Sequence, residues 1–343
     1  MPETLETPNS SFSKLLPRLQ LSWDSTSLGE LKLCPRRYQY SIIEGWAEQG
    51  ESVHLKFGLI YHAALELHDK AQADGRDCSE AANIALRYAL SATWDDALGR
   101  PWSSDHSNKN RETLIRSIIY YLDDFSKDSL ETLVLSNGRA AVELSFSFKW
   151  PWRETVEGEE FSLCGHVDRV VKFQNEIWVT DKKTTKNTIN QAYFARFSPD
   201  NQVSLYSFAG RVIFGTETKG MIIDAAQILV EDTRFQRGFI DRKTSTIDEW
   251  IEDTDHYLAL AEHYARRNYW PQNDKNCSGV YLDPVTGEPS FGCPFRPVCA
   301  SAPEIRPDLL RLNYTKRVWD PIKVRNGTET RTEVQLEPEL EPA

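Results

Sequence analysis

The sequence predicts one α/β domain in which a mixed central sheet is flanked by helices. Apolar side chains recur at helical spacing through most of residues 21–130, which predicts a helical N-terminal portion. Polarity then alternates with period two over much of 140–183, the pattern of half-buried strands. A chain of 343 residues has room for two modest domains, but we expect a single one that spans residues 21–310.

Four helical segments are expected in the N-terminal portion. Ser27-Leu28-Gly29-Glu30 is a capping-box pattern, and it begins a helix that Pro35 interrupts. The other three are expected at about 58–73, 80–98 and 112–127.

Strands are expected in the middle of the chain. One is predicted by apolar side chains that alternate with polar ones at Ala140, Val142, Leu144, Phe146 and Phe148. Two more are expected at about 161–173 and 177–183, joined by a tight turn at Gln174-Asn175. A fourth strand is predicted by the apolar run at 220–231.

Two later helices complete the expected layers. Ser198 offers an N-cap and Pro199 a first helical position for a helix that runs to about Val212. A long amphipathic pattern predicts another helix at 246–267. Residues 270–303 are rich in Pro, Gly, Asn and Cys, so we expect loops that must be stabilised by groups outside the segment.

Negative charge is concentrated near the C-terminal end. The chain has a net charge of −11, and Glu329–Ala343 holds five Glu and one Arg, so this segment carries −4 and −7 remains. Residues 311–343 are therefore expected to form an acidic, disordered tail, and residues 1–20 a flexible arm. The acidic total weakens a nucleic-acid-binding function without excluding it, since positive charge is needed only where phosphates lie.

Several classes of protein are disfavoured. No window approaches 18 uncharged apolar residues and no apolar h-region begins the chain, so we expect neither a membrane span nor a signal peptide. A cytoplasmic location is expected, where the six cysteines would be reduced or metal-bound. No internal repeat and no GxxxxGK[ST] loop is present, which argues against a built-in ATPase motor.

The segment WVTDKKTTKN, residues 178–187, brings charged groups to the end of a predicted strand. Side chains alternate along a strand, so Asp181 and Lys183 share one face while Lys182 points the other way. A two-residue turn at Gln174-Asn175 would place Asp168 opposite Asp181, with Cβ atoms roughly 5 Å apart.

Two carboxylates at that distance repel each other unless a cation lies between them. Mg²⁺ is the natural choice, and Lys183 would then hold a nucleophilic water or a phosphate oxygen. Ordinary cross-strand ion pairs are the alternative, and a turn one residue longer would shift the register.

Five motifs follow one another in the order seen in a known family. They are STSLGELKLCPRRYQY with Ser25, Ser27, Cys34 and Pro35, FGLIYHAALE with Gly58, His62 and Glu66, GHVDRVV with Asp168, VTDKKT with Asp181, Lys183 and Thr184, and QVSLYSFA with Gln202 and Tyr206. This pattern resembles the PD-(D/E)xK nuclease superfamily, in its RecB-type branch of nucleases, like those of CRISPR adaptation, that carry a four-cysteine iron–sulfur cluster. The resemblance implies a restriction-endonuclease-like core.

The resemblance also implies roles for individual residues. His62, Asp168, Asp181 and the backbone carbonyl of Lys182 would bind Mg²⁺ or Mn²⁺. Lys183 would activate or position the attacking water, and Gln202 and Tyr206 would orient the DNA strand or Lys183. His62 and Glu66 are four residues apart, as are Gln202 and Tyr206. Each pair therefore shares one helix face, which is compatible with a single cleft. Glu66 and Glu143 are optional further carboxylates, and Arg36, Arg37 and Arg169 are candidate phosphate contacts or, alternatively, surface charges or salt-bridge partners.

The cysteines suggest a second metal centre. Cys277, Cys293 and Cys299 lie in a Pro-rich stretch that is poor core material but can converge thiolates on a metal. With Cys34, the family layout implies a [4Fe–4S] cluster, and structural Zn²⁺ is the alternative. Fifteen residues separate Cys277 from Cys293, more than the family pattern has, which an inserted hairpin turning at Thr286-Gly287 would explain. Cys78 and Cys164 are expected to be plain thiols.

These inferences predict a metal-dependent DNA nuclease, expected to be an exonuclease, that acts in DNA repair, recombination or phage DNA processing. Its substrate would be single-stranded DNA or duplex ends, with a helicase or recombination protein as a partner, and its host a prokaryote or a phage. A non-catalytic DNA-binding or scaffold subunit of the same fold, or an RNA nuclease, is the alternative.

Overall fold

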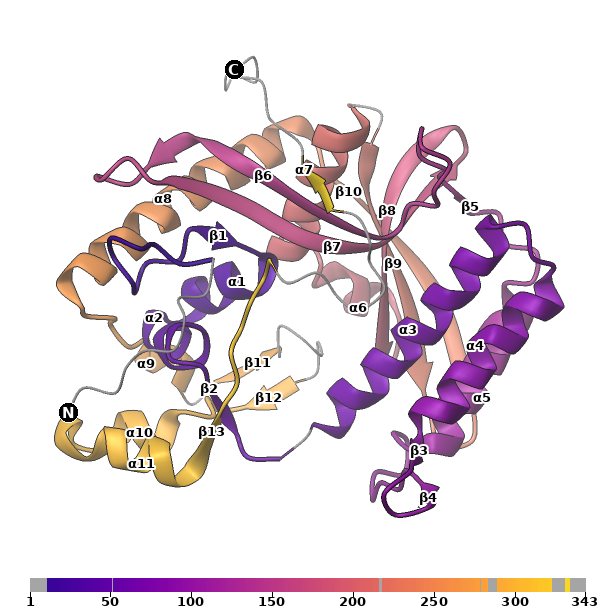
Figure 1. The fold of residues 1–343 in the computed structure, drawn as a ribbon, viewed down its shortest axis with the longest axis horizontal. Coiled ribbons are helices and arrows are strands. Elements are labelled where there is room, and N and C mark those ends of the chain that lie inside the picture. Colours follow the sequence, from indigo (N-terminus) through magenta and orange to yellow (C-terminus); the bar gives the residue numbers. More distant parts are fainter. Residues whose placement is uncertain are drawn as a thin grey trace.

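A mixed sheet forms the centre of the protein (Figure 1). In this computed structural model, the described residues are 11–50, 52–215, 218–277, 279–282, 289–322 and 331–333. The sheet has the order β10-β9-β8-β7-β6-β14, and β1 and β5 both pair with β7. Its strands are β1 (Ser22–Trp23), β5 (Glu131–Thr132), β6 (Val142–Glu154), β7 (Glu160–Phe173), β8 (Glu176–Thr185), β9 (Thr218–Ile228), β10 (Thr233–Asp241) and β14 (Arg331–Glu333).

Both parallel and antiparallel pairs occur in this sheet. The pairs β8–β9, β6–β14 and β1–β7 are parallel, and β6–β7, β7–β8 and β9–β10 are antiparallel. The predicted fold class, a mixed sheet flanked by helices, is therefore confirmed.

The hairpin between β7 and β8 has the predicted turn and register. Gln174 and Asn175 have φ values of 50° and 66°, the left-handed conformation that a two-residue hairpin turn requires and that Asn tolerates well. Phe173 pairs with Glu176, and the ladder continues to Arg169 opposite Thr180.

Helices cover both faces of the sheet. They are α1 (Ser25–Leu33), α2 (Pro35–Tyr38), the π-helical turn η1 (Gln39–Ile43), α3 (Val53–Ala73), α4 (Cys78–Ala92), α5 (Arg111–Asp124), α6 (Gln191–Ala195), α7 (Asn201–Phe214), α8 (Thr244–Arg267), α9 (Asp274–Cys277), α10 (Arg296–Ala300), the 3₁₀ turn η2 (Pro303–Ile305) and α11 (Arg306–Asn313). Short pairs β2 (Trp46–Glu48) with β13 (Tyr314–Lys316), β3 (Trp94–Asp95) with β4 (Arg100–Pro101), and β11 (Val280–Leu282) with β12 (Pro289–Phe291) lie outside the sheet. Within the described ranges, no helix has the length and apolarity needed to cross a bilayer.

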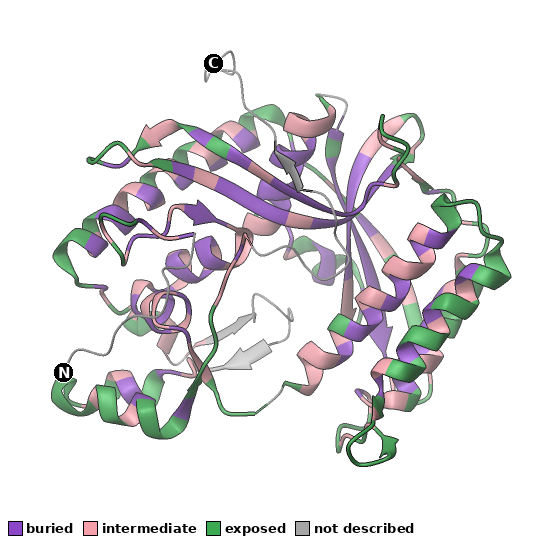
Figure 2. Ribbon diagram, viewed as in Figure 1, coloured by how far each residue is buried: buried purple, intermediate pink, exposed green. Residues whose placement is uncertain are grey.

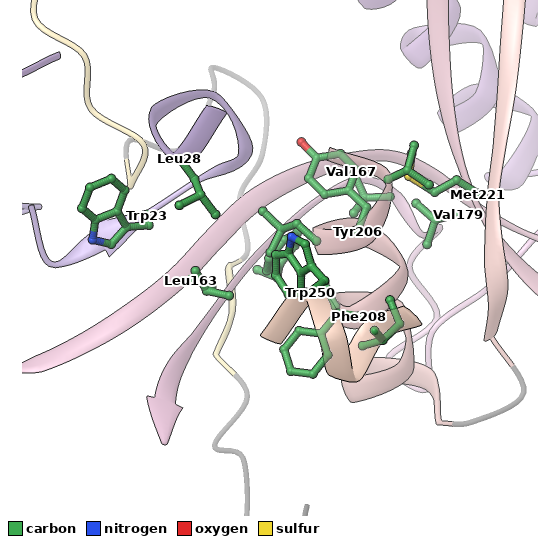
Figure 3. Packing of buried hydrophobic residues seen from close by; sticks show 14 of the residues in the cluster. Trp23, Leu28, Leu163, Val167, Val179, Tyr206, Phe208, Met221 and Trp250 are labelled. Atoms are coloured by element: carbon green, nitrogen blue, oxygen red, sulfur yellow. The ribbon is translucent and has the colours of Figure 1, made fainter. Parts of the chain in front are cut away.

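Two apolar clusters define the layers. The larger one joins β6–β9 to α1, α7 and α8, and Figure 3 shows Tyr206, Phe208 and Trp250 packed near Leu163 and Val179. The smaller one joins α3, α4 and α5 to β9 on the other face. Burial follows the same division, with β6 and β7 buried along most of their lengths and α4 exposed on its outer side (Figure 2).

Two parts of the predicted organisation need correction. Residues 11–20 are no flexible arm, because Leu19 is fully buried and Phe12 bridges to Gln20. Residues 311–343 are not disordered throughout, because β13 pairs with β2 and β14 pairs with β6.

Two local predictions also need revision. The helix after Ser198-Pro199 begins at Asn201 instead, because the carboxylate of Asp200 accepts a hydrogen bond from Val203 N and caps it. Strand β10 was not predicted at all. The inserted hairpin between the cysteines is present as β11 and β12, whereas its expected turn at 286–287 lies outside the described residues.

Candidate active site

Two acidic side chains lie where β7 and β8 separate. The ladder between these strands ends at Arg169 and Thr180, and the same register continued by one residue brings Asp168 opposite Asp181. Asp168 Oδ2 instead accepts a hydrogen bond from the backbone N–H of Lys182 at 2.8 Å. A carboxylate therefore occupies the position that a backbone carbonyl would take if the ladder continued.

Helix α3 contributes a histidine to this fork, the place where β7 and β8 separate. His62 Nδ1 lies 3.2 Å from Asp168 Oδ2. The helix begins at an N-cap where Ser52 Oγ accepts from Leu55 N, and it buries Phe57, Tyr61 and Leu65 in the smaller apolar cluster. Burial opposes ionisation of Asp168, but the charge and hydrogen bond of His62 and the charge of Lys182 outweigh it and hold the pKa of this carboxyl below its ordinary value.

Helix α7 contributes an amide to the same site. Lys183 Nζ lies 2.8 Å from Asp181 Oδ2 and donates to Gln202 Oε1 at 3.0 Å, while Gln202 Nε2 donates to Asp181 Oδ1 at 3.3 Å. Burial raises the pKa of Asp181, and Asp168 adds to this effect while Lys183 opposes it. Burial lowers the pKa of Lys183, but Asp181 outweighs burial and leaves that pKa above its ordinary value, so Lys183 is a cationic hydrogen-bond donor.

Tyr206 follows Gln202 by one turn of α7 and lies near Lys183. Its ring meets Phe146 of β6 edge-on, with centroids 6.0 Å apart. Gly165 of β7 lies beneath both rings. A Cβ there would lie 2.8 Å from Phe146 Cζ and 3.1 Å from Tyr206 Cε1, so the glycine three residues before Asp168 makes room for Tyr206.

Gly165→Ala is expected to displace Tyr206 or Phe146 and to lower activity by about 100-fold, the scale associated with a misplacement of about 1 Å at an active site. Overpacking should also cost about 1–3 kcal/mol of unfolding free energy. Steady-state kinetics and thermal unfolding would measure both effects. Gly29→Ala in α1 is the matched control, because a Cβ there meets nothing within 4 Å. Wild-type kinetics in Gly165→Ala would contradict the prediction.

The donor set at the fork suits a hard divalent cation. Asp181 Oδ2 is buried and accepts no hydrogen bond from the described residues, although Lys183 Nζ lies at ion-pair distance. Two carboxylates, one imidazole and a backbone carbonyl are ligands that Mg²⁺ or Mn²⁺ accepts. No three His, Cys, Asp or Glu side chains in the described ranges are arranged to hold a metal ion, and Asp168 and Asp181 each pair with a cationic group. A bound ion would replace these ion pairs.

The comparison with known families identifies the superfamily of this chain. Residues 23–300 match the family model described as PD-(D/E)XK nuclease superfamily. The chain belongs to this superfamily. A superfamily of nucleases implies a nucleic-acid substrate. No curated protein matches the chain significantly.

Two solved structures are similar to this superfamily member at low identity. The "Putative exonuclease" from Eubacterium rectale has 10% identity and a TM-score of 0.43, and the match covers 87% of this chain and 98% of that one. The protein SSO0001 has 12% identity and a TM-score of 0.27, and the match covers 69% of this chain and 76% of that one.

The three arginines predicted as phosphate contacts lie elsewhere in this nuclease-superfamily chain. Arg37 Nε lies 2.6 Å from Glu30 Oε2, and Arg36 Nε donates to the carbonyl of Trp270. Arg169 donates to Thr132 Oγ1 and to the carbonyl of Leu130, on the face opposite Gln202. All three are buried. Arg37 and Arg169 lie within ion-pair distance of carboxylates, as the salt-bridge alternative expects, and contact of these arginines with phosphate stays a prediction.

Other acidic and hydroxyl groups occupy defined positions. Glu66 pairs with Lys70 on α3. Glu143 is buried in β6 with φ 51°, between residues that pair with Arg169 and Val167, so it lies level with Asp168.

Thr184, next to Lys183, accepts a hydrogen bond from the buried ammonium of Lys109 at 2.9 Å. Sequence reasoning had not identified Lys109, because a single lysine before a helix carries no motif.

The four predicted cluster cysteines occupy one region. Cys293 N donates to Cys277 O, and Asn273 N donates to Cys34 Sγ at 3.2 Å. Burial raises the pKa of the Cys299 thiol to about 11. Arg36 opposes this rise, and thiolate charge on the other three cysteines adds to it. The thiols are thus near one another, but among described side chains no three of them are arranged to hold a metal.

Proposed function

We propose that this protein is a metal-dependent deoxyribonuclease that hydrolyses phosphodiester bonds. The observation that carries the proposal is the convergence of His62, Asp168, Asp181 and Lys183 where β7 and β8 separate. Each comes from a motif of the nuclease superfamily, and α3 and the β7–β8 hairpin bring them together. A non-catalytic subunit would have no physical need to bury two carboxylates side by side.

In this proposal Asp168, Asp181, His62 and the carbonyl of Lys182 hold Mg²⁺ or Mn²⁺. The bound ion would supply Lewis-acid stabilisation of the negative charge that develops in phosphodiester hydrolysis.

Lys183 donates a hydrogen bond to the attacking water or to a phosphate oxygen. Gln202 keeps Lys183 and Asp181 in place through its two amide hydrogen bonds. Tyr206, packed against Phe146, borders the ammonium and orients it.

We further propose exonuclease action at DNA ends, in DNA repair, recombination or phage DNA processing. A partner such as a helicase would supply translocation, since the chain contains no GxxxxGK[ST] loop.

The proposal is tested with end-labelled and internally labelled single- and double-stranded DNA, and with RNA, in Mg²⁺ or Mn²⁺. Release of mononucleotides from DNA ends is expected. Cleavage of circular DNA would overturn the exonuclease part, and preference for RNA would replace the substrate. Absence of hydrolysis in all conditions would leave a DNA-binding or scaffold subunit.

We also propose that Cys34, Cys277, Cys293 and Cys299 bind a [4Fe–4S] cluster, with a structural Zn²⁺ ion as the alternative metal centre. The donor set fits either centre. The shared neighbourhood of the thiols supports the proposal, although their present arrangement would have to tighten around the metal.

Cys34→Ser is expected to lose the cluster and to weaken the contact of α1 with the segment that contains Asn273 and Asn276, which donate to the carbonyl of Leu33. Visible absorption and iron and zinc content of an anaerobically purified sample would measure the loss. Cys78→Ser, an exposed cysteine on α4, is the matched control and should keep the metal. A wild-type protein with neither iron nor zinc would contradict the proposal.

A further inference from the structure

A buried ion pair lies on the far side of β8, the strand that carries Asp181 and Lys183 and is called the catalytic strand below. Lys182 Nζ is 2.8 Å from Asp69 Oδ2, and the two side chains are 3% and 4% exposed. An ammonium and a carboxylate at this distance form an ion pair, and in a buried setting its attraction depends strongly on geometry.

This ion pair joins α3 to β8. Asp69 follows His62 by seven residues, close to two helical turns, so both side chains project from the same side of α3. Along β8, Asp181 and Lys183 contact Gln202 of α7, whereas Lys182 points to the other face and meets Asp69. Helix α3 thus contacts the fork at two points, His62 on Asp168 and Asp69 on Lys182.

Asp69 belongs to a larger, mostly buried group of balanced charge. Three carboxylates and three cations make it up, namely Asp69, Asp128 and Asp224 with Lys182, Arg169 and Arg237. Lys182, Arg169, Asp224 and Arg237 come from β8, β7, β9 and β10, and Asp128 follows α5. Among the six, Asp69 alone comes from α3, so this group holds α3 to the sheet through one side chain.

We propose that Asp69 is a positioning residue that, through Lys182, sets where α3 lies on the catalytic strand and so places His62 at the metal site. This inference rests on the proposed metal-dependent function. Helix α3 also buries apolar side chains such as Ile60, Ala64 and Leu65, and apolar contacts are non-directional. The ion pair supplies a specific position along the helix axis, in the way that outer partners of metal ligands orient them.

Two variants test the inference. Removing Asp69 alone would leave Lys182 buried without a partner and could unfold the protein. The first variant therefore combines Asp69→Leu with Lys182→Met, which replaces the pair by apolar groups. Asp69→Glu is the second variant, because it keeps the charge and moves it by one methylene. Asp128→Asn is the matched control, since it disturbs the same buried group without touching α3.

Calorimetric titration with Mn²⁺ and the electron paramagnetic resonance spectrum of bound Mn²⁺ are the primary measurements. Thermal unfolding is measured in parallel. Both Asp69 variants are expected to bind Mn²⁺ at least about 10-fold more weakly, the range seen when partners of metal ligands are lost. Asp128→Asn should lose stability but keep its affinity for Mn²⁺. Nuclease activity should recover in the Asp69 variants at high Mn²⁺ concentration.

Wild-type Mn²⁺ affinity in either folded Asp69 variant would overturn the inference. Failure of the proposed function gives a different result, namely no Mn²⁺ binding by the wild type or unchanged binding in Asp181→Ala. The two failures are therefore distinguishable.

Discussion

Asp181→Asn and Lys183→Met are each expected to abolish nuclease activity, with kcat lowered by at least about 1,000-fold, or roughly 4 kcal/mol of transition-state stabilisation. Asp181→Asn removes one of the two adjacent carboxylates that would hold the metal ion. Lys183→Met removes the cation that Asp181 and Gln202 hold in place. Single-turnover hydrolysis of labelled DNA in saturating Mg²⁺ would measure the chemical step separately from substrate binding.

The two variants should differ in their binding of metal. Asp181→Asn is expected to lose Mn²⁺ affinity, whereas Lys183→Met should retain it. Lys172→Met is the matched control, because Lys172 is an exposed lysine on β7. Activity within about 10-fold of the wild type in either active-site variant would refute the assigned roles.

Arg237→Met is expected to give the largest loss of stability, about 3–5 kcal/mol, because it removes the shared cationic partner of Asp128 and of the buried Asp224. Arg237 donates to both carboxylate oxygens of Asp128 at 2.6 and 2.8 Å and lies 3.2 Å from Asp224. Its guanidinium also stacks over Phe125, 3.9 Å from the ring centroid. Urea-induced unfolding followed by circular dichroism would measure the loss.

A second arginine on β10 supplies a control for this change. Arg234, also on β10, is 65% exposed and pairs with Asp232. Surface ion pairs of this kind contribute up to about 1 kcal/mol, so Arg234→Met should be nearly neutral. Equal stability of the two variants would show that the ion pairs of Arg237 with Asp128 and Asp224 contribute nothing to the free energy of unfolding.

The hairpin could be predicted from sequence because its determinants are local. Alternating polarity marked both strands, and Asn175 beside Gln174 supplied the left-handed turn that sets the register. Asp181, Lys183 and the opposite direction of Lys182 followed from that register and the two-residue period. The family motifs then connected His62 and Gln202 to the same site.

The rest depended on partners distant in the chain. Strand β10 was missed because Arg237, one of its inward-facing side chains, is charged, which breaks the apolar alternation. The partners of Arg169 could not be predicted, because nothing near it in sequence indicates Asp69 or Asp128. The buried contact of Asp69 with Lys182 was not predicted for the same reason, since a lone acidic residue on a helix is usually solvated.

The separation of β7 from β8 makes one amide group an intrinsic spectroscopic probe of the site. Lys182 N–H donates to the carboxylate of Asp168, not to a backbone carbonyl of β7, while β8 remains paired with β9 from Trp178 to Thr185. A change in the charge of Asp168, or coordination of its carboxylate by a metal ion, therefore changes the electron density at a single backbone proton. The nuclear magnetic resonance frequency of that proton would follow occupancy of the site without any label placed in it.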